Sequence, residues 1–494
     1  MANKPTDEQQ QAIDVANSGS SFKISAFAGT GKTSTLTFIG AELNKRPYRS
    51  KDCMYLAFNK AIADESQSKF TSNVKCRTFH SLAFRGTPNH ITQKINNHRL
   101  LPHELQKMMS LRNWETRNKQ GKFEKSSPYE QAMTLNRGLE CFCRSSSTEI
   151  SHRHIEASLP SWINRSEANE LITYLTPKLQ ALWDMSISKN YDFRISHDVY
   201  LKYWSLTNPV IPTNTIFFDE AQDADPIMLN IIRRQQSQCI FTGDRFQAIY
   251  EWRGAKNAME KLQLPEVKLT QSWRFGQSVA DVANLILSKL FDEKTLIKGN
   301  PNINSSIAPI ASPTAYIVRT NATALTLAIE LINKGITPTL VIDYQSISQQ
   351  VREIQELMNG TITESRRSCV YGFQSWGDVQ EYVEHSANSD LTIIVNLIKK
   401  NTPDEILSVL NHLMKQSHSN LSQITITTAH KSKGLEFKKV KVLGDFMWNE
   451  EGEKDKPLIE DAEGRLLYVA CTRAIDQMDI TELHPLFENI NKIK

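Results

Sequence analysis

The strongest constraint on the fold is a short glycine-containing loop near the start of the chain, within the segment FKISAFAGTGKT at residues 22–33. Apolar residues alternate before the loop, and residues 36–43 place apolar side chains at helical spacing after it. The segment therefore predicts a strand, a loop and a helix in direct succession, as in a phosphate-binding loop. A chain that contains this unit is expected to build a parallel sheet flanked by helices.

Each polar group of the loop suits a bound triphosphate. Gly29 and Gly31 let backbone N–H groups approach phosphate oxygens, and the start of the following helix favours negative charge. Lys32 supplies a cation for the terminal phosphates, and Thr33 supplies a hydroxyl group for Mg²⁺. Ala26 stands where the usual pattern has its first glycine. The alternative for this motif alone is a chance Gly-Lys-Thr turn at the start of a helix.

An acidic pair further along the chain would complete such a site. Residues 215–218 are β-branched and aromatic, and they predict a buried strand that ends directly before Asp219 and Glu220. Two acids at the carboxyl end of a strand suit coordination of Mg²⁺ by Asp219 and activation of water by Glu220. The alternative is a solvated acidic turn, which the upstream loop makes the weaker interpretation.

The composition is that of an ordinary globular protein and says little about partners. Hydrophobic residues make up 40% and charged residues 23%, and the net charge is +4. This charge permits an anionic partner but is too small to argue for one, so a nucleic acid must be inferred from motifs. The chain shows neither paired cysteines at metal-binding spacing nor a signal peptide or membrane-spanning run, and we expect a cytoplasmic protein.

The segment GDRFQAIYEWRGA at residues 243–255 resembles the third motif of the UvrD/Rep family of superfamily 1 helicases. Further motifs of that family follow in its order and cover almost the whole chain. They are TDEQ at 6–9, FNK at 58–60, TFH at 78–80, QSWR at 271–274, HKSKGLE at 430–436 and LYVACTRA at 467–474. The sequences of several segments are most similar to those of the F-box DNA helicase branch. We nevertheless expect no F-box, because the motor motifs begin at the N-terminus.

The resemblance implies an α/β fold of two RecA-like parallel-sheet motor domains that hold ATP and Mg²⁺ between them. Catalysis would depend on Lys32, Thr33, Asp219, Glu220, Gln247, Arg253, Arg274 and Arg473, with Thr33 and Asp219 on the metal. The nucleotide would contact Gln9, Ala28, Gly29, Thr30, Gly31, Lys32, Thr33, Ser34, Trp273, Arg274, Glu436 and Arg473. Trp273 would stack on the adenine, Gln9 would bind its edge and Glu436 would bind the ribose.

On the DNA side, the resemblance implies aromatic side chains that stack on bases of any sequence, as a motor that passes every base requires. The DNA-binding residues would be Phe58, Asn59, Thr78, His80, Tyr250, Trp252 and His430. Phe58 could instead be a core residue, because it ends an apolar strand. Partners would be single-stranded DNA and junctions between single and double strands, without a membrane.

The motifs also predict a domain arrangement. Residues 1–90 and 200–268 would form motor domain 1A, and residues 269–345 and 420–494 would form motor domain 2A. Residues 91–199 would be a helical 1B-like insertion, with a partly disordered insert as the alternative. The remaining stretch, 346–419, is short for a full 2B domain and predicts a reduced 2B-like insertion.

Two functions fit these motifs. The leading hypothesis is an ATP-dependent translocase on single-stranded DNA and 3′–5′ helicase in DNA repair, recombination or defence, with its polarity taken from the resemblance. The second is a DNA-stimulated ATPase that acts as a switch or sensor in an immunity or regulatory complex without processive unwinding. The reduced 2B-like insertion supports the second hypothesis, because that module affects how such a motor grips duplex.

Overall fold

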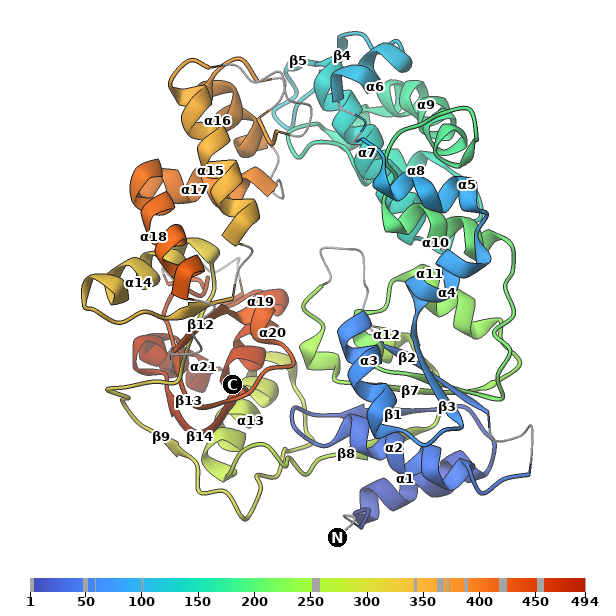
Figure 1. The fold of residues 1–494 in the computed structure, drawn as a ribbon, viewed down its shortest axis with the longest axis vertical. Coiled ribbons are helices and arrows are strands. Elements are labelled where there is room, and N and C mark those ends of the chain that lie inside the picture. The colour runs from blue at the N-terminus through green and yellow to red at the C-terminus, as the bar shows by residue number, and fades with distance from the viewer. Residues whose placement is uncertain are drawn as a thin grey trace.

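The computed structural model describes residues 4–47, 52–57, 59–98, 100, 102–250, 258–341, 344–361, 368–370, 373–385, 390–416, 424–450 and 457–493. Figure 1 shows two sheets side by side, each surrounded by helices and each carrying a helical arm above it. We name these parts the first and second domain and the first and second arm.

In the described residues, six parallel strands form the sheet of the first domain in the order β3-β2-β6-β7-β1-β8. They are β1 (Phe22–Ala26), β2 (Cys53–Ala57), β3 (Val74–Thr78), β6 (Thr215–Phe218), β7 (Gln238–Gly243) and β8 (Glu266–Leu269). Strands β2, β6 and β7 are buried along their whole length, as expected for a parallel sheet with helices on both faces. The helices of this domain are α1 (Asp7–Asn17), α2 (Lys32–Leu43), α3 (Lys60–Lys69), α4 (Phe79–Gly86), α11 (Pro226–Arg233) and α12 (Ala258–Lys261).

The second domain repeats this architecture in the part of the chain that the structure describes. Its six parallel strands have the order β11-β12-β10-β13-β14-β9. They are β9 (Ser306–Ile307), β10 (Ala315–Val318), β11 (Thr339–Leu340), β12 (Thr425–Thr428), β13 (Phe437–Val442) and β14 (Ala474–Asp479). Its helices are α13 (Gln277–Phe291), α14 (Asn321–Asn333), α19 (Ala429–Ser432), α20 (Asp461–Cys471) and α21 (His484–Lys492). Two parallel-sheet α/β domains are therefore present, as the sequence predicts.

The first arm is an ordered helical unit with one antiparallel hairpin, β4 (Trp114–Arg117) and β5 (Phe123–Ser126). Its helices are α5 (Asn89–Thr92), α6 (Pro102–Met108), α7 (Pro128–Arg144), α8 (His152–Glu156), α9 (Asn169–Ile187) and α10 (His197–Leu206). Leu135, Phe142, Leu175 and Leu179 are buried in a core that continues into the first domain. The alternative of a partly disordered insert is therefore wrong for the described residues of this arm.

The second arm consists of α15 (Tyr344–Met358), α16 (Trp376–His385), α17 (Asp390–Lys400) and α18 (Pro403–Gln416). Val351, Ile354, Val395 and Leu410 are buried in one cluster that also contains Ile426 of strand β12. The arm therefore shares its core with the edge of the second sheet.

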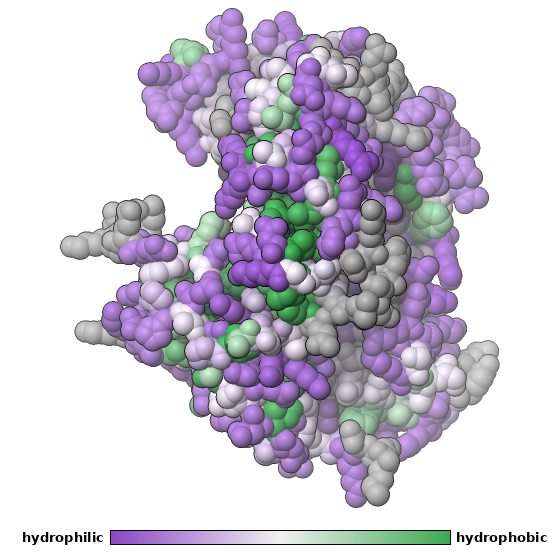
Figure 2. Space-filling model, turned by 60° about the vertical axis from the view of Figure 1, so that its left-hand side comes forward, coloured by the Kyte–Doolittle hydropathy of each residue, from purple (hydrophilic) through white to green (hydrophobic). Residues whose placement is uncertain are grey.

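The two arms meet at their tips, away from the sheets (Figure 1). The ring of Tyr129, at the start of α7, lies 6.4 Å from that of Phe373 and 5.7 Å from that of Tyr382. Figure 2 shows a largely hydrophilic face on the side of the second domain, notched between its upper and lower parts. Among the described residues, no helix combines the length and apolar character that crossing a membrane would require.

Candidate functional site

The glycine-containing loop lies at the carboxyl end of β1 and leads directly into α2. Gly29 and Gly31 have φ values of 74° and 82°, a conformation that residues with a Cβ atom rarely adopt. A Cβ atom at Gly29 would lie 2.6 Å from Ser272 Oγ and 2.7 Å from Arg274 Cβ. The loop is therefore packed against the segment that enters the second domain, and only glycine fits at position 29.

Gln9 and Trp273 both lie close to Gly31 of the loop. A Cβ atom at Gly31 would lie 3.4 Å from Gln9 Nε2 and 3.6 Å from Trp273 Cδ1. The backbone N–H of Trp273 donates a hydrogen bond to the carbonyl oxygen of Gly29 at 2.8 Å. The indole is 44% exposed, which leaves a large apolar ring beside the loop. This arrangement suits a planar base next to the phosphates.

The acid pair follows β6 and faces Lys32. Lys32 Nζ lies 3.7 Å from Glu220 Oε1, and the Tyr55 hydroxyl donates to Asp219 Oδ2 at 2.6 Å. Burial and the charge of Glu220 raise the pKa of Asp219 to about 6. Burial opposes ionisation of Glu220 as well, but Lys32 and Lys433 outweigh it and lower the pKa of Glu220 to about 2. The two acids are thus held in different environments, as separate roles in chemistry require.

The backbone at Glu220 is left-handed, with φ of 52°, which is uncommon for a residue other than glycine. Gln222, fully buried, donates to the Glu220 carboxylate and accepts a hydrogen bond from the backbone N–H of Asp244 at 3.1 Å. Gln247 Nε2 donates to Asp244 Oδ2 at 2.8 Å. These hydrogen bonds join the ends of β6 and β7 and fix the direction of the Glu220 side chain.

Lys433, to which the sequence motifs assign no role, extends from the second domain into this acid cluster. Its Nζ donates to the Asp223 carboxylate and to the carbonyl oxygen of Gln247 at 2.7 Å, and it lies 3.8 Å from Glu220 Oε2. Burial opposes the charged form, but Asp223 and Glu220 outweigh it and raise the pKa of Lys433. The motif HKSKGLE indicates a functional segment, but only geometry shows which of its lysines bridges the domains.

Tyr468 makes a second bridge, which its motif in the sequence does not indicate. Its hydroxyl accepts a hydrogen bond from the backbone N–H of Ala28 at 3.1 Å and donates one to Asp244 Oδ2 at 3.0 Å. Burial and the nearby Asp244 carboxylate keep the pKa of Tyr468 well above its usual value, so the phenol stays protonated. One hydroxyl group of the second domain therefore connects the glycine loop and β7 of the first.

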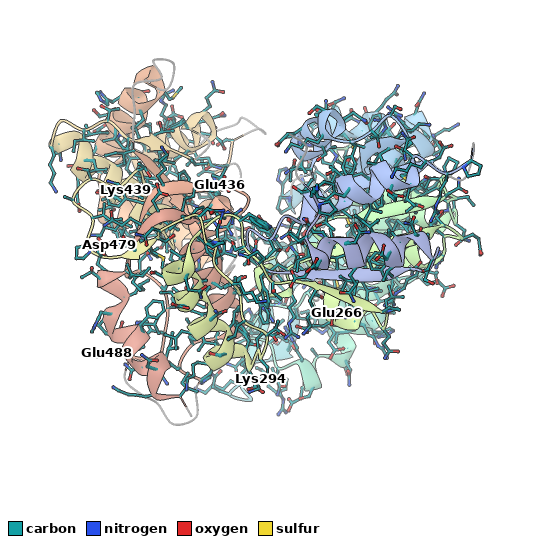
Figure 3. All side chains as sticks on the ribbon, turned by 90° about the horizontal axis from the view of Figure 1, so that it is seen from below. Glu266, Lys294, Glu436, Lys439, Asp479 and Glu488 are labelled. Carbon is teal, nitrogen blue, oxygen red and sulfur yellow. The ribbon has the colours of Figure 1, made fainter. Side chains whose placement is uncertain are left out.

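Two of the three expected arginines lie at this boundary. Arg274 Nε donates to Glu436 Oε2 at 3.0 Å, and Figure 3 shows Glu436 on the second domain where it faces the first. Arg473 is 1% exposed, and its guanidinium donates to the neutral oxygens of Val469, Leu435 and Thr472. Burial and the neighbouring Arg274 lower the pKa of Arg473, against the opposing effect of Asp244 and Glu220. Arg253 lies outside the described residues.

Of the expected DNA-binding residues that the structure describes, Asn59, Thr78 and His80 lie at or just after the ends of β2 and β3, and His430 lies just after β12. Asn59 and Thr78 cap helices, accepting hydrogen bonds from the backbone N–H groups of Ile62 at 2.9 Å and Ser81 at 3.1 Å. His80 Nε2 lies 3.8 Å from Asp198 Oδ1 of α10, which links α4 to the first arm. Phe58 and Trp252 lie outside the described residues.

Tyr250 lies near the Lys433 bridge, and His430 belongs to α19, the short helix that directly precedes Lys433. Lys433 Nζ lies 5.6 Å from the centroid of the Tyr250 ring. Burial and Arg319 lower the pKa of His430 to about 4, so its imidazole is neutral at pH 7. A neutral imidazole can donate and accept hydrogen bonds without attracting a phosphate by charge.

Comparison with known proteins gives matches over nearly the whole chain. A family model described as UvrD/REP helicase N-terminal domain matches residues 6–263, and one described as UvrD-like helicase C-terminal domain matches residues 339–483. F-box DNA helicase 1 of Gallus gallus is 28% identical over 95% of this chain and 48% of its own length. F-box DNA helicase protein 1 of Schizosaccharomyces pombe is 30% identical over 97% of this chain and 58% of its own length. The chain thus spans roughly half the length of these relatives.

Proposed function

Because the chain belongs to the UvrD/Rep family of helicases, we propose that it is an ATP-dependent translocase on single-stranded DNA and a 3′–5′ DNA helicase. Its role would lie in DNA repair, recombination or defence. The proposed domain limits are 1A at residues 1–90 and 200–268, 1B-like at 91–199, 2A at 269–345 and 420–494, and 2B-like at 346–419. DNA and junctions between single and double strands are the proposed partners.

The observation that best supports this proposal is the convergence of both domains on the glycine loop. Lys32 and Glu220 come from the first domain and lie 3.7 Å apart. Arg473 comes from the second domain, where it is buried among neutral oxygens near Arg274. A buried arginine whose hydrogen bonds within the described residues go to neutral oxygens suits an anion whose charge grows during reaction, as in phosphoryl transfer.

Oxygen donors at the site fit a magnesium ion, which binds carboxylate and hydroxyl oxygens with several waters. Asp219 Oδ2 accepts from Tyr55 at 2.6 Å and Oδ1 accepts from the backbone N–H of Glu220 at 2.9 Å. These two bonds fix the carboxylate and leave further lone pairs on both oxygens. Thr33, at the start of α2, would supply the second protein oxygen. ATP with the metal would supply the phosphoryl group that is transferred.

The side chains of this protein would then bind the nucleotide, orient the attacking water and accept its proton. Glu220, with its lowered pKa, is ionised at pH 7 and would accept the proton of an attacking water. Gln247, held by Asp244 at 2.8 Å, would orient that water. Trp273 and Gln9 would hold the adenine beside Gly31.

Coupling to DNA would run through the short connection between Gln247 and Tyr250. Lys433 contacts both, since it donates to the Gln247 carbonyl oxygen at 2.7 Å and lies 5.6 Å from the Tyr250 ring. A shift of the second domain would move Lys433 relative to both residues at once. Nucleotide-dependent domain closure would therefore displace a base stacked near Tyr250.

A strand-displacement assay with ATP on duplexes that carry only a 3′ or only a 5′ tail tests the proposal. A 3′–5′ helicase unwinds the 3′-tailed duplex and leaves the 5′-tailed duplex intact. Unwinding of neither, together with ATPase activity that single-stranded DNA stimulates, would favour the alternative of a switch or sensor. The short 2B-like stretch at residues 346–419 supports this alternative, because that module affects how such a motor grips duplex.

A further inference from the structure

Helix α1 is joined by one carboxylate to the segment that leads into the second domain. Glu8, in the first turn of α1, accepts two hydrogen bonds from Thr270, one from its backbone N–H at 2.8 Å and one from its hydroxyl group at 2.6 Å. Thr270 is buried and directly follows β8. Hydrogen bonds to a carboxylate are stronger than those between neutral groups, so this pair holds the start of α1 against the end of β8.

The neighbouring residue, Gln9, is buried with its side-chain amide fixed in one direction. The backbone N–H of Thr6 donates to Gln9 Oε1 at 3.0 Å, and Gln9 Nε2 donates to Thr35 Oγ1 at 3.1 Å. The Thr35 hydroxyl group donates in turn to the Gly31 carbonyl oxygen at 3.0 Å. Because a backbone N–H can only donate, the oxygen of the amide must be the atom that faces Thr6.

This direction of the amide suits adenine better than guanine. The hydrogen bonds within the described residues use one lone pair of Gln9 Oε1 and one N–H of Nε2, which leaves one acceptor and one donor for a ligand. Adenine presents a donor at N6 beside an acceptor at N7, whereas guanine presents acceptors at both O6 and N7. An amide oxygen opposite guanine O6 would place two acceptors against each other, which disfavours guanine.

The other end of the pair leads to Trp273. The Thr270 carbonyl oxygen accepts from the backbone N–H of Lys298 at 3.0 Å, and the Lys298 carbonyl oxygen accepts from the N–H of Ser272 at 2.8 Å. The N–H of Trp273 donates to the Gly29 carbonyl oxygen at 2.8 Å. The path of the backbone from Thr270 to Trp273 is therefore fixed, and a shift of Thr270 would displace the indole as well.

We propose that Glu8 is a positioning residue for the nucleotide base, because by binding Thr270 it keeps Gln9 and Trp273 at the separation that one adenine ring requires. This inference deepens the proposed function and rests on it. Glu8 acts on Gln9 through the first turn of α1 and on Trp273 through the backbone that follows Thr270. The phosphates would bind the glycine loop at the start of α2 instead, so base binding and phosphate binding can be measured separately.

The test is steady-state hydrolysis of ATP and of GTP by the full chain with single-stranded DNA, with inorganic tripolyphosphate as a competitive inhibitor. Glu8→Gln should raise KM for ATP and leave kcat nearly unchanged, because the base is held less well while the acids and arginines keep their places. The preference for ATP over GTP in kcat/KM should fall by about fivefold or more, since a bidentate contact to adenine contributes about five- to 150-fold to discrimination. The inhibition constant of tripolyphosphate, which has no base, should stay the same.

Asp7→Asn is the matched control, because Asp7 is exposed in the same turn of α1 and its substitution removes the same charge from the start of the helix. It should keep the KM for ATP and the preference for ATP. Thr270→Val removes the hydroxyl group and should lower the preference, whereas Thr270→Ser keeps the hydroxyl group and should retain it. Glu8→Gln with Thr270→Val should lower the preference by less than the product of the two single effects, since both changes weaken one contact.

An unchanged preference for ATP in Glu8→Gln would overturn the inference, as would a wild type that hydrolyses ATP and GTP equally well. A lower Tm together with equal rises in KM for ATP and in the inhibition constant of tripolyphosphate would also overturn it, because Glu8 would then only stabilise the domain. If wild type does not hydrolyse ATP with single-stranded DNA, the proposed function itself fails. If wild type prefers ATP and Glu8→Gln behaves in the same way, only the role of Glu8 fails.

Discussion

The Tyr468 hydroxyl group is the bridge between the domains that can be removed with the least change in shape. Tyr468→Phe deletes one oxygen from a fully buried side chain. The change removes the hydrogen bond from the Ala28 N–H at 3.1 Å and the one to Asp244 Oδ2 at 3.0 Å. Asp244 keeps the hydrogen bond from the Gln247 side-chain amide at 2.8 Å, so its carboxylate still has a donor, whereas the Ala28 N–H loses its acceptor.

The expected loss follows from these contacts. A net hydrogen bond contributes about 0.5–1.5 kcal/mol, and a buried polar group left unpaired costs about 1–3 kcal/mol. Because Asp244 retains other donors, we expect a total loss of about 1–3 kcal/mol, which corresponds to a fall in Tm of about 2–12 °C for a domain of this size. ATP hydrolysis should also fall, because the glycine loop would lose its hydrogen bond from Ala28 to the second domain.

Thermal melting with and without a non-hydrolysable ATP analogue and Mg²⁺ checks this expectation. If the loop binds phosphate, the analogue offers the Ala28 N–H a new acceptor, and the gap in Tm between variant and wild type should narrow. Tyr344→Phe is the matched control, since the Tyr344 hydroxyl donates to the Leu340 carbonyl oxygen at 2.6 Å and accepts from its N–H at 3.0 Å. That variant should lose stability without a change in ATPase activity or in its response to the analogue. A Tyr468→Phe protein with wild-type Tm and ATPase activity would refute the bridging role.

The remaining predictions concern the nucleotide site, DNA binding and one buried lysine. Lys32→Ala should abolish ATP hydrolysis and leave the protein folded, because Lys32, at the start of α2, is partly exposed and not a core residue; DNA-stimulated turnover in the folded variant would contradict this. Glu220→Gln should bind an ATP analogue normally and hydrolyse ATP slowly, and loss of binding would show that the base is assigned wrongly. Single-strand affinity should be nearly independent of sequence and fall with a slope of about −0.7 per neutralised phosphate in log salt, so strong sequence preference at fixed salt would count against a translocase. Trp252→Ala should weaken single-strand binding by about 1–3 kcal/mol with an unchanged salt slope, and a destabilised protein with proportionate loss of all activities would indicate a packing role instead. Burial lowers the pKa of Lys202 to about 8. Since the unfolded chain binds the proton more tightly, the free energy of unfolding of wild type should rise by about 2 kcal/mol relative to that of Lys202→Met between pH 8 and pH 10. A difference between the two proteins that stays constant over this pH range in denaturant titrations would contradict this.

The fold could be predicted from the sequence because each motif that indicates it lies within one short stretch of the chain. Residues 22–33 and 215–220 contain the strand, the turn and the charged groups in one short stretch each, so a parallel sheet with acids at its carboxyl edge could be predicted. The structure gives both segments this form, with Gly31 left-handed at the start of α2 and both acids following β6.

The contacts between the domains could not be predicted from the sequence in this way. Lys433 and Asp223 are 210 residues apart, and Tyr468 and Ala28 are 440 apart. No periodicity or spacing in the sequence relates such pairs, because their approach depends on how two folded domains pack. The ordered first arm was also uncertain from its polar composition, since its buried residues are dispersed among Ser, Asn and Lys.

Movement along single-stranded DNA is the central claim, and displacement of streptavidin from biotinylated single strands measures it most directly. A 3′–5′ translocase displaces streptavidin from the 5′ end in the presence of ATP and leaves it on the 3′ end. We expect this asymmetry for wild type and no displacement from either end for Lys32→Ala. Equal displacement from both ends, or none by a wild-type protein whose ATPase is stimulated by the same strands, would contradict the account of a directional motor.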